Sequence, residues 1–353
     1  MLFSLRSVMV VCVVSWSVVS AQDSSADGGA PSDLAARTAE LYERSHATLL
    51  AAFDLDEDYQ NSYLPTELGV PCHEWRFSAE VWGEAVEKSA PARELFAQAA
   101  ALPAPRFEEL LAMGLAELDE VDLCPRLGEV MQVVAAHGDL VRSEQPRQAL
   151  NDAYTLLRFS RHLVGHGRTE GIWIGRNAEQ LGIRILRDTL VDDCSERTSP
   201  AILERCATEL DRHRSERANL ATVGGYLLAE LPKTVPGPGP AVEGEPRPPA
   251  ELAKTRDDRA RALAVLKQLI EPLTADPPPT PESYREHLEP HRARIARLQA
   301  WAPSHPEYRM LAGFCFLVDQ ALPPVDSFVE EEARFRQWCD EAGARLAELR
   351  RAR

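Results

Sequence analysis

Apolar residues recur at steps of three and four positions through almost all of the chain beyond residue 32. Such spacing keeps them on one face of an α-helix, which has about 3.6 residues per turn. Alternating apolar and polar positions, which are typical of a half-buried strand, are almost absent. We therefore predict an all-α protein. Short loops between most of the helices favour a multi-helix bundle or a short α-solenoid of antiparallel helical hairpins.

Local signals predict where several helices begin and end. His137, Gly138 and Asp139 indicate the end of one helix, and Ser199 followed by Pro200 indicates the start of another. Beyond residue 250 the sequence predicts four helices, whose expected N-cap residues are Thr255, Thr280, Ser304 and Ser327. The pair Pro323 and Pro324 predicts a turn between the last two, which would then form a hairpin.

A proline-rich segment divides the helical pattern. Seven prolines lie between residues 232 and 249, together with three glycines. That composition is typical of an extended linker or a disordered loop. We therefore predict an α-helical region at 32–231, a linker or loop at 232–250 and a C-terminal four-helix region at 251–353.

The start of the chain has the features of a secretory signal peptide at 1–21. An uncharged, valine-rich stretch at 8–19 follows Arg6, and Val19 and Ala21 are the small residues expected before a cleavage site. The apolar stretch would span about 18 Å as a helix, less than the roughly 30 Å of a hydrocarbon core. We expect cleavage near Ala21, a flexible segment at 22–31, and an exported mature chain, periplasmic or extracellular, with no stable membrane insertion.

The negative net charge of the chain limits the kinds of partner that it can bind. The chain has 39 Lys and Arg against 55 Asp and Glu, a formal net charge of −16. Such a charge repels phosphate backbones, and no basic patch offsets it, so we expect no nucleic-acid partner. The sequence holds no nucleophile elbow and no phosphate-binding loop, and we expect no cofactor.

Export changes how the cysteines are interpreted, because an oxidising compartment favours disulfides. Cleavage would leave six cysteines, and no two of them have the C-x-x-C spacing of a zinc or redox motif. We predict that Cys194 pairs with Cys206 across a polar turn, the alternative being buried thiols. Elimination then pairs Cys315 with Cys339, and Cys72 with Cys124.

Two groups of residues have the spacing of metal ligands. His162, His166 and Glu170 are four positions apart, so one helical face could present all three to zinc. The glycines at 165 and 167 favour the alternative that the helix ends there and that a histidine caps its last carbonyls.

Asp54, Asp56 and Asp58 match the first positions of a calcium-binding loop. Tyr59 stands where such a loop needs glycine, and Pro65 where it needs a bidentate glutamate, which favours a plain acidic loop.

One stretch of the chain resembles a known group of proteins. Its residues are Gly138 and Asp139, the pair Ala149 and Leu150, the run 156–163 and a second amphipathic helix from Gly171, with an upstream segment at 72–77. It is similar to a loose group of uncharacterised bacterial exported helical proteins. The resemblance implies an all-helical fold and assigns no activity.

Three functions remain open on this basis. The first is an exported, non-catalytic interaction or scaffold protein that binds a protein or peptide partner of the cell envelope in a groove between helices. The second is a secreted metal-dependent hydrolase that uses His162, His166 and Glu170. The third is a structural envelope protein without a specific ligand.

Overall fold

The computed structural model describes residues 33–55, 64, 74–104, 123–164, 169–191, 199–216, 220–234, 249–301, 303–305 and 309–352. Across these residues the regular structure consists of α-helices and one 3₁₀-helix, and no strand occurs among them. The predicted all-α, multi-helix fold is therefore confirmed. Contacts divide the chain into two compact units.

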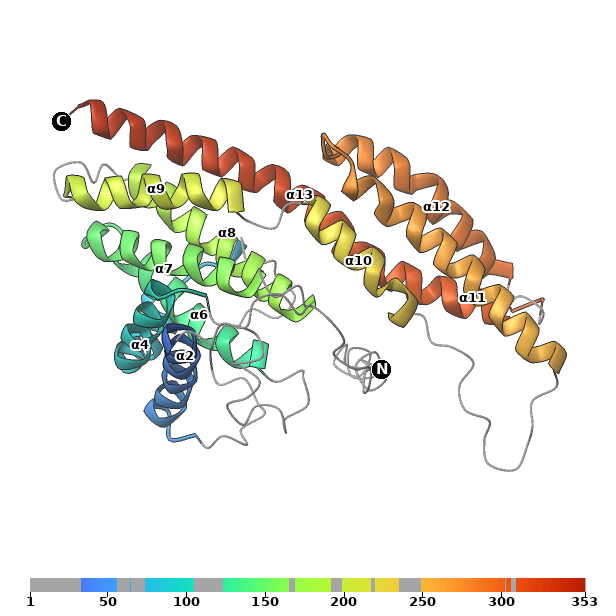
Figure 1. The fold of residues 1–353 in the computed structure, drawn as a ribbon, viewed down its shortest axis with the longest axis horizontal. Helices are drawn as coiled ribbons and strands as arrows, with labels where there is room; N and C mark the ends of the chain where they lie inside the picture. The colour runs from blue at the N-terminus through green and yellow to red at the C-terminus, as the bar shows by residue number, and fades with distance from the viewer. Residues whose placement is uncertain are drawn as a thin grey trace. The chain divides into compact units, whose positions relative to one another are not determined.

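The first unit, called the N-terminal unit below, comprises the described residues up to 216 together with 335–352. Its elements, shown in Figure 1, are α2 (Asp33–Ala52), α3 (Ala79–Lys88), α4 (Ala90–Ala101), α6 (Leu123–Val141), α7 (Pro146–Val164), α8 (Thr169–Val191), α9 (Pro200–Glu216) and the last part of α13 (Arg309–Arg351). Within this unit α7 packs against α4, α6, α8 and α9. Its core position explains why nearly every residue from Ala149 to Leu163 is buried or half-buried.

Small residues let the central helices approach closely. A Cβ atom on Gly182 of α8 would lie 3.1 Å from the carbonyl oxygen of Ala153 on α7. A Cβ atom on Gly138 of α6 would lie 3.2 Å from the Cβ of Asp152 on α7 and 3.2 Å from the Ile185 side chain on α8. Either position would push its neighbour away if it carried a side chain, because interiors are close-packed.

The second unit, called the middle unit, comprises the described residues between 220 and 334. It contains α10 (Leu220–Thr234), α11 (Pro249–Ile270), the 3₁₀-helix η2 (Glu271–Thr274), α12 (Pro281–Trp301) and the first part of α13. Tyr284 of α12 is buried and donates its hydroxyl to the Leu269 carbonyl of α11 at 2.8 Å. That bond fixes α12 against α11.

Some predicted helix boundaries are confirmed. Helix α9 begins at Pro200, directly after Ser199. Helix α12 begins at Pro281, and the Thr280 hydroxyl accepts a hydrogen bond from the Ser283 backbone N–H at 3.2 Å. Both signals are local, so they do not depend on tertiary packing.

Three other boundary predictions are wrong. Helix α6 continues past His137–Asp139 to Val141, since Gly138 serves close packing rather than a stop. Helix α11 begins at Pro249, so Thr255 lies inside it and is buried. Helix α13 runs from Arg309 through Pro323, Pro324 and Ser327, so the predicted turn and the last predicted helix start do not exist. The fixed φ of proline, near −65°, is compatible with a helix, although each proline removes one backbone donor and its ring crowds the preceding turn.

Among the described residues after 250, the chain contains most of α11, then η2, α12 and α13, and the last two predicted helices form one continuous helix. Residues from 335 onward group with the N-terminal unit and not with α11 and α12. Most of the segment predicted as a linker, 235–248, lies outside the described residues, as do the predicted signal peptide 1–21 and the segment 22–31.

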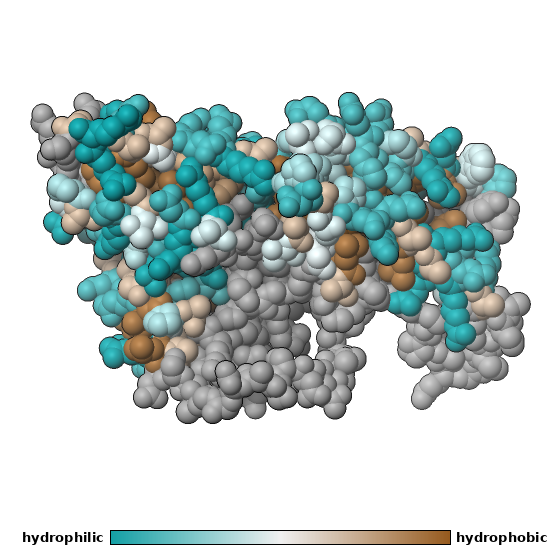
Figure 2. All heavy atoms as spheres, turned by 45° about the horizontal axis from the view of Figure 1, so that its top comes forward, coloured by the Kyte–Doolittle hydropathy of each residue, from teal (hydrophilic) through white to brown (hydrophobic). Residues whose placement is uncertain are grey.

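Among the described residues, no helix combines the length and the apolar character required to cross a membrane. On the face shown in Figure 2 the described surface is mainly hydrophilic, and apolar residues are scattered in small areas. Four large apolar side chains in the described part are well exposed, each on a different helix: Leu34, Val81, Val191 and Trp301.

Candidate functional site: a groove between α9 and α13

Two helices far apart in the sequence lie side by side in the N-terminal unit. Ion pairs join Arg214 to Asp340 and Glu204 to Arg350, so residue numbers rise along α9 as they fall along α13. The two helices are therefore antiparallel (Figure 1). Each turns apolar residues into the core of the unit: Ile202, Leu203 and Leu210 from α9, and Phe335, Trp338, Ala342, Leu346 and Leu349 from α13.

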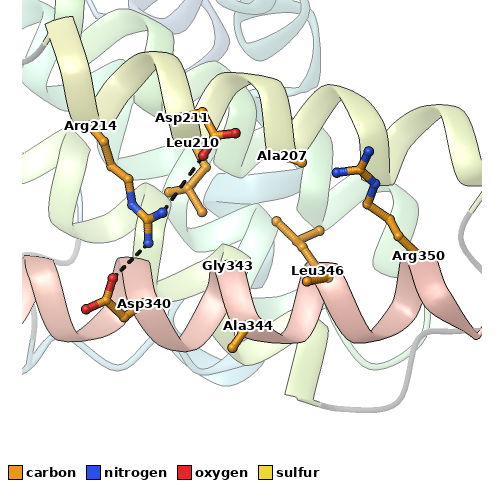
Figure 3. A pocket seen from close by; sticks show the side chains of 10 residues that line it. Ala207, Leu210, Asp211, Arg214, Asp340, Gly343, Ala344, Leu346 and Arg350 are labelled. Carbon is orange, nitrogen blue, oxygen red and sulfur yellow. Dashed lines mark hydrogen bonds and ion pairs between the residues drawn. The ribbon is translucent and has the colours of Figure 1, made fainter.

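A shallow groove runs between the outward edges of these two helices (Figure 3). It encloses about 350 Å³. Ten residues line it: Ala207, Leu210, Asp211 and Arg214 from α9, and Asp340, Gly343, Ala344, Leu346, Ala347 and Arg350 from α13. Small or apolar residues form its middle, because the two helices present alanine and glycine where larger side chains would fill the space.

Charged residues close both ends of the groove. At one end Arg214 Nη2 lies 3.0 Å from Asp340 Oδ1, and Asp211 lies 3.8 Å from the same guanidinium group. At the other end Arg350 Nη2 lies 2.8 Å from Glu204 Oε2. The side chain of Asp340 is 82% exposed and that of Arg350 is 52% exposed, so both can interact with an incoming molecule.

Gly343 determines how Arg214 crosses the groove. A Cβ atom on Gly343 would lie 3.2 Å from Arg214 Nη2. The guanidinium group therefore rests on the bare backbone of α13 as it reaches Asp340 (Figure 3). A side chain at this position would lift the arginine away from the helix.

Buried polar contacts hold α9 in place beneath the groove. His213 Nε2 lies 2.8 Å from Glu179 Oε1 of α8, and His213 is fully buried. Arg161 Nη2 of α7 lies 2.8 Å from Glu209 Oε1, and burial raises the pKa of Glu209 although Arg161 opposes that shift. Losing either contact would leave a buried polar group without its partner, which costs free energy, so these contacts hold α9 in a defined position.

The last part of α13 is fixed from α8. The guanidinium group of Arg187 lies 4.6 Å from the centre of the Trp338 ring, within the range of a cation–π contact. The same arginine lies 3.8 Å from Glu341, and Arg345 donates to the Leu190 carbonyl at 3.2 Å. Contacts with α7 and α8 therefore hold both helices that form the groove, α9 and α13, in place.

A second polar cluster ties α6 to α7. His137 Nδ1 lies 2.5 Å from Asp152 Oδ2, and both side chains are mostly buried. Burial raises the pKa of Asp152, while His137 lowers it. We interpret this pair as a contact between the two helices.

The predicted metal ligands do not share a helix. His162 lies on α7, which ends at Val164, and α8 begins at Thr169. His162 is buried, and its Nδ1 lies 2.9 Å from the hydroxyl of Tyr42, which ties α7 to α2. His166 and the side chain of Glu170 lie outside the described residues. In the described part, no group of three His, Cys, Asp or Glu side chains is placed to hold a metal ion.

The predicted calcium ligands fall largely outside the described residues. Asp54 follows α2 with a positive φ of 56°, a conformation that aspartate tolerates better than most residues. Asp56 and Asp58 are not among the described residues, so the calcium loop stays a prediction.

The cysteine pairings also stay predictions. Cys206 of α9 and Cys339 of α13 are buried in the core of the N-terminal unit. Cys194 and Cys72 lie outside the described residues, as do the side chains of Cys315 and Cys124.

Sequence reasoning did not find the groove. Arg214 and Asp340 are 126 positions apart, and no spacing rule connects them. The only available signal was that the surface of each helix carries small residues between charges, such as Asp340, Gly343, Ala344, Ala347 and Arg350.

Comparison with known proteins gives no relative: no protein-family model, no curated protein and no solved structure matches this chain. The resemblance to exported helical proteins is therefore still a prediction.

Proposed function

We propose that this protein is an exported, non-catalytic interaction module that binds a polypeptide partner of the cell envelope in the groove between α9 and α13. The observation that carries the proposal is the groove itself, with a floor of small residues between two charged ends. The small residues leave room for side chains of a partner, and the charged ends offer polar contacts of the kind found at the rim of protein interfaces.

Two features of the groove favour binding of a partner over catalysis: the helices that form it are held in place, and its lining lacks most of the usual catalytic residue types. Buried pairs such as Glu179–His213 position α9 from inside the core, away from the groove lining. The lining contains two aspartates and two arginines but no His, Cys, Ser, Thr or Tyr. Preformed walls lower the entropy lost when a partner binds, because little has to be ordered.

The metal-dependent hydrolase has less support. It needs His162, His166 and Glu170 together, but His162 lies on α7, Glu170 lies on α8, and His162 already contacts Tyr42. Elemental analysis of the purified mature chain tests it directly, and stoichiometric zinc, iron or manganese would favour the hydrolase over the interaction module.

Photo-crosslinking from inside the groove tests the interaction module. A photoreactive amino acid replaces Ala344, an exposed residue of the lining, and the matched control replaces Glu94, an exposed residue of α4 in the same unit. We expect a discrete light-dependent adduct with a polypeptide from position 344 but not from position 94. Equal products from both positions, or no adduct from 344, would contradict the proposal.

A further inference from the structure

We infer that His287 and His291 of α12 form a site for a divalent transition-metal ion, zinc or copper, with water completing the coordination. The inference goes beyond the proposed function and does not depend on it, because both histidines lie in the middle unit and the groove lies in the N-terminal unit. Both side chains are half-buried, so an ion can reach them from solvent.

The two imidazole rings lie side by side on α12. They are four residues apart, which places them on neighbouring turns of the same helix face. Pro290 lies between them, but α12 continues through it to Trp301, so this relation is kept. The ring centres are 5.2 Å apart, with 48° between the ring planes. The fold itself thus places two imidazoles next to each other.

The separation of the rings matches that of two histidines bound to one metal ion. A zinc ion at about 2.0 to 2.1 Å from a ring nitrogen lies roughly 3.2 Å from the centre of that ring. Two such rings at the tetrahedral angle of about 109° have centres about 5.2 Å apart. The centres of the His287 and His291 rings are 5.2 Å apart. The helix backbone therefore need not move for both rings to bind one ion.

A contact with α11 determines the tautomer of His287. Its Nε2 lies 2.9 Å from the backbone carbonyl oxygen of Gln268. A carbonyl only accepts hydrogen bonds, so Nε2 carries the proton, and in the neutral ring Nδ1 keeps its lone pair. Metal-binding histidines usually donate their second ring nitrogen to a carbonyl or a carboxylate in this way. His287 therefore has the tautomer and the outer contact that a metal ligand needs.

His291 supplies the second lone pair. Within the part of the chain that the structure describes, it contacts the ring of His287 and has no hydrogen-bond partner. Its pKa is lowered from the usual value, first by burial and then by the charges of His287 and Arg294. The ring is therefore neutral near pH 7, which is the form that binds a metal ion.

The surrounding charges permit a cation at the pair. Two acidic and two basic residues of α12 flank the histidines: Glu286, Glu289, Arg292 and Arg294. Their formal charges balance, and Arg285 is paired with Glu330 at 2.7 Å. Binding therefore depends on bonds to imidazole, which favour zinc and copper over magnesium, because magnesium prefers oxygen ligands.

Two protein ligands hold the ion, whereas a structural zinc site has four, so the ion should exchange with solvent. In the described part, no third His, Cys, Asp or Glu side chain is placed to join the pair. The experiment therefore uses the mature full-length chain without a histidine tag, freed of metal by a chelator before defined ions are added back.

Titration calorimetry with Zn²⁺, Cu²⁺ and Mg²⁺ tests the site. We expect the unchanged chain to bind Cu²⁺ more tightly than Zn²⁺ at this site, following the general order of affinities. His291→Gln should weaken both association constants at least about tenfold, since losing even an outer contact of a ligand typically costs about 10- to 100-fold. The same substitution should leave any binding of Mg²⁺ unchanged. It removes no hydrogen bond within the described part, so without metal the variant should melt like the unchanged chain.

His305→Gln is the matched control, because His305 is an exposed histidine of the same unit outside the pair. This variant should bind Zn²⁺ and Cu²⁺ like the unchanged chain, whereas His287→Gln should lose affinity as His291→Gln does. An unchanged chain that binds neither ion up to about 1 mM, or a His291→Gln variant that binds both as tightly as before, would overturn the inference. Crosslinking from the groove is a separate measurement, so either result leaves the proposed function standing.

Discussion

Glu209 and Glu204 lie on the same helix, α9, in opposite surroundings. Glu209 is buried against Arg161, whereas the side chain of Glu204 is 58% exposed beside Arg350. Burial raises the pKa of Glu209, because removing water destabilises the charged form more than the neutral form. The buried Glu209 carboxyl group should therefore couple protonation to folding.

The raised pKa of Glu209 predicts a dependence of stability on pH. The folded chain holds the proton of Glu209 more tightly than the unfolded chain does. The stability from this group is therefore complete below the unfolded pKa of about 4.3, and it is lost as pH rises through the folded value. Glu209→Gln removes this titration, so the variant should gain free energy of unfolding relative to the unchanged protein as pH rises from about 4 to about 7.

Urea unfolding at a series of pH values measures this difference. Glu204→Gln makes the same change at an exposed position of the same helix and serves as the matched control. A difference for Glu209→Gln that does not grow with pH would show that the buried carboxyl does not titrate as argued.

Two predicted helix caps show how far a single residue can predict the start of a helix. Thr280 was predicted as a cap, and its hydroxyl does accept the Ser283 N–H. Thr255 was also predicted as a cap, but it lies inside α11 and is buried. A cap depends only on the residues next to it in the sequence, so the motif at Thr280 predicted the start of α12 correctly. At Thr255 the same type of residue packs inside a longer helix, which local signals do not reveal.

At the scale of elements, adjacent glycines in α10 have different surroundings. A Cβ atom on Gly224 would lie 2.9 Å from the Leu273 Cβ of η2 and 3.3 Å from its backbone carbonyl carbon. A Cβ atom on Gly225 would meet nothing within 4 Å. The absence of a side chain at Gly224 therefore lets α10 and η2 pack closely, while Gly225 only weakens the helix.

These surroundings predict opposite effects of the same substitution. Gly224→Ala should lower the free energy of unfolding of the middle unit by about 1 to 3 kcal/mol, because backbone atoms of η2 must move. Gly225→Ala should raise it by up to about 1 kcal/mol, because alanine is the better helix former.

Thermal unfolding of both variants, with hydrogen exchange of the α10 amides, tests the pair. Equal effects of the two substitutions would show that α10 and η2 are not packed as described.

At the scale of the whole molecule, α13 contributes residues to both units. Leu346, near its end, is 1% exposed in the core of the N-terminal unit, and Leu288 of α12 is fully buried in the middle unit. The core of the N-terminal unit is therefore completed by the end of the chain.

The division into two units predicts that a core substitution in one unit lowers the hydrogen-exchange protection of that unit alone. Leu346→Ala and Leu288→Ala should each cost about 2 to 5 kcal/mol, the usual range for a buried leucine. Hydrogen exchange should show lost protection in α7 to α9 for Leu346→Ala, and in α11 and α12 for Leu288→Ala. If both variants lose protection over the same helices, the two units do not unfold separately.

The sequence by itself determined the fold class and several helix starts. The period of apolar residues depends only on the geometry of one helix, and caps such as Thr280 act within one turn. Tertiary structure decided the features that join distant parts of the chain. These are the continuous helix α13, the buried contact between Glu179 and His213, and the groove at one end of which Arg214 pairs with Asp340. The physical reason is that those contacts join residues far apart along the chain, and only the packing of the helices brings them together.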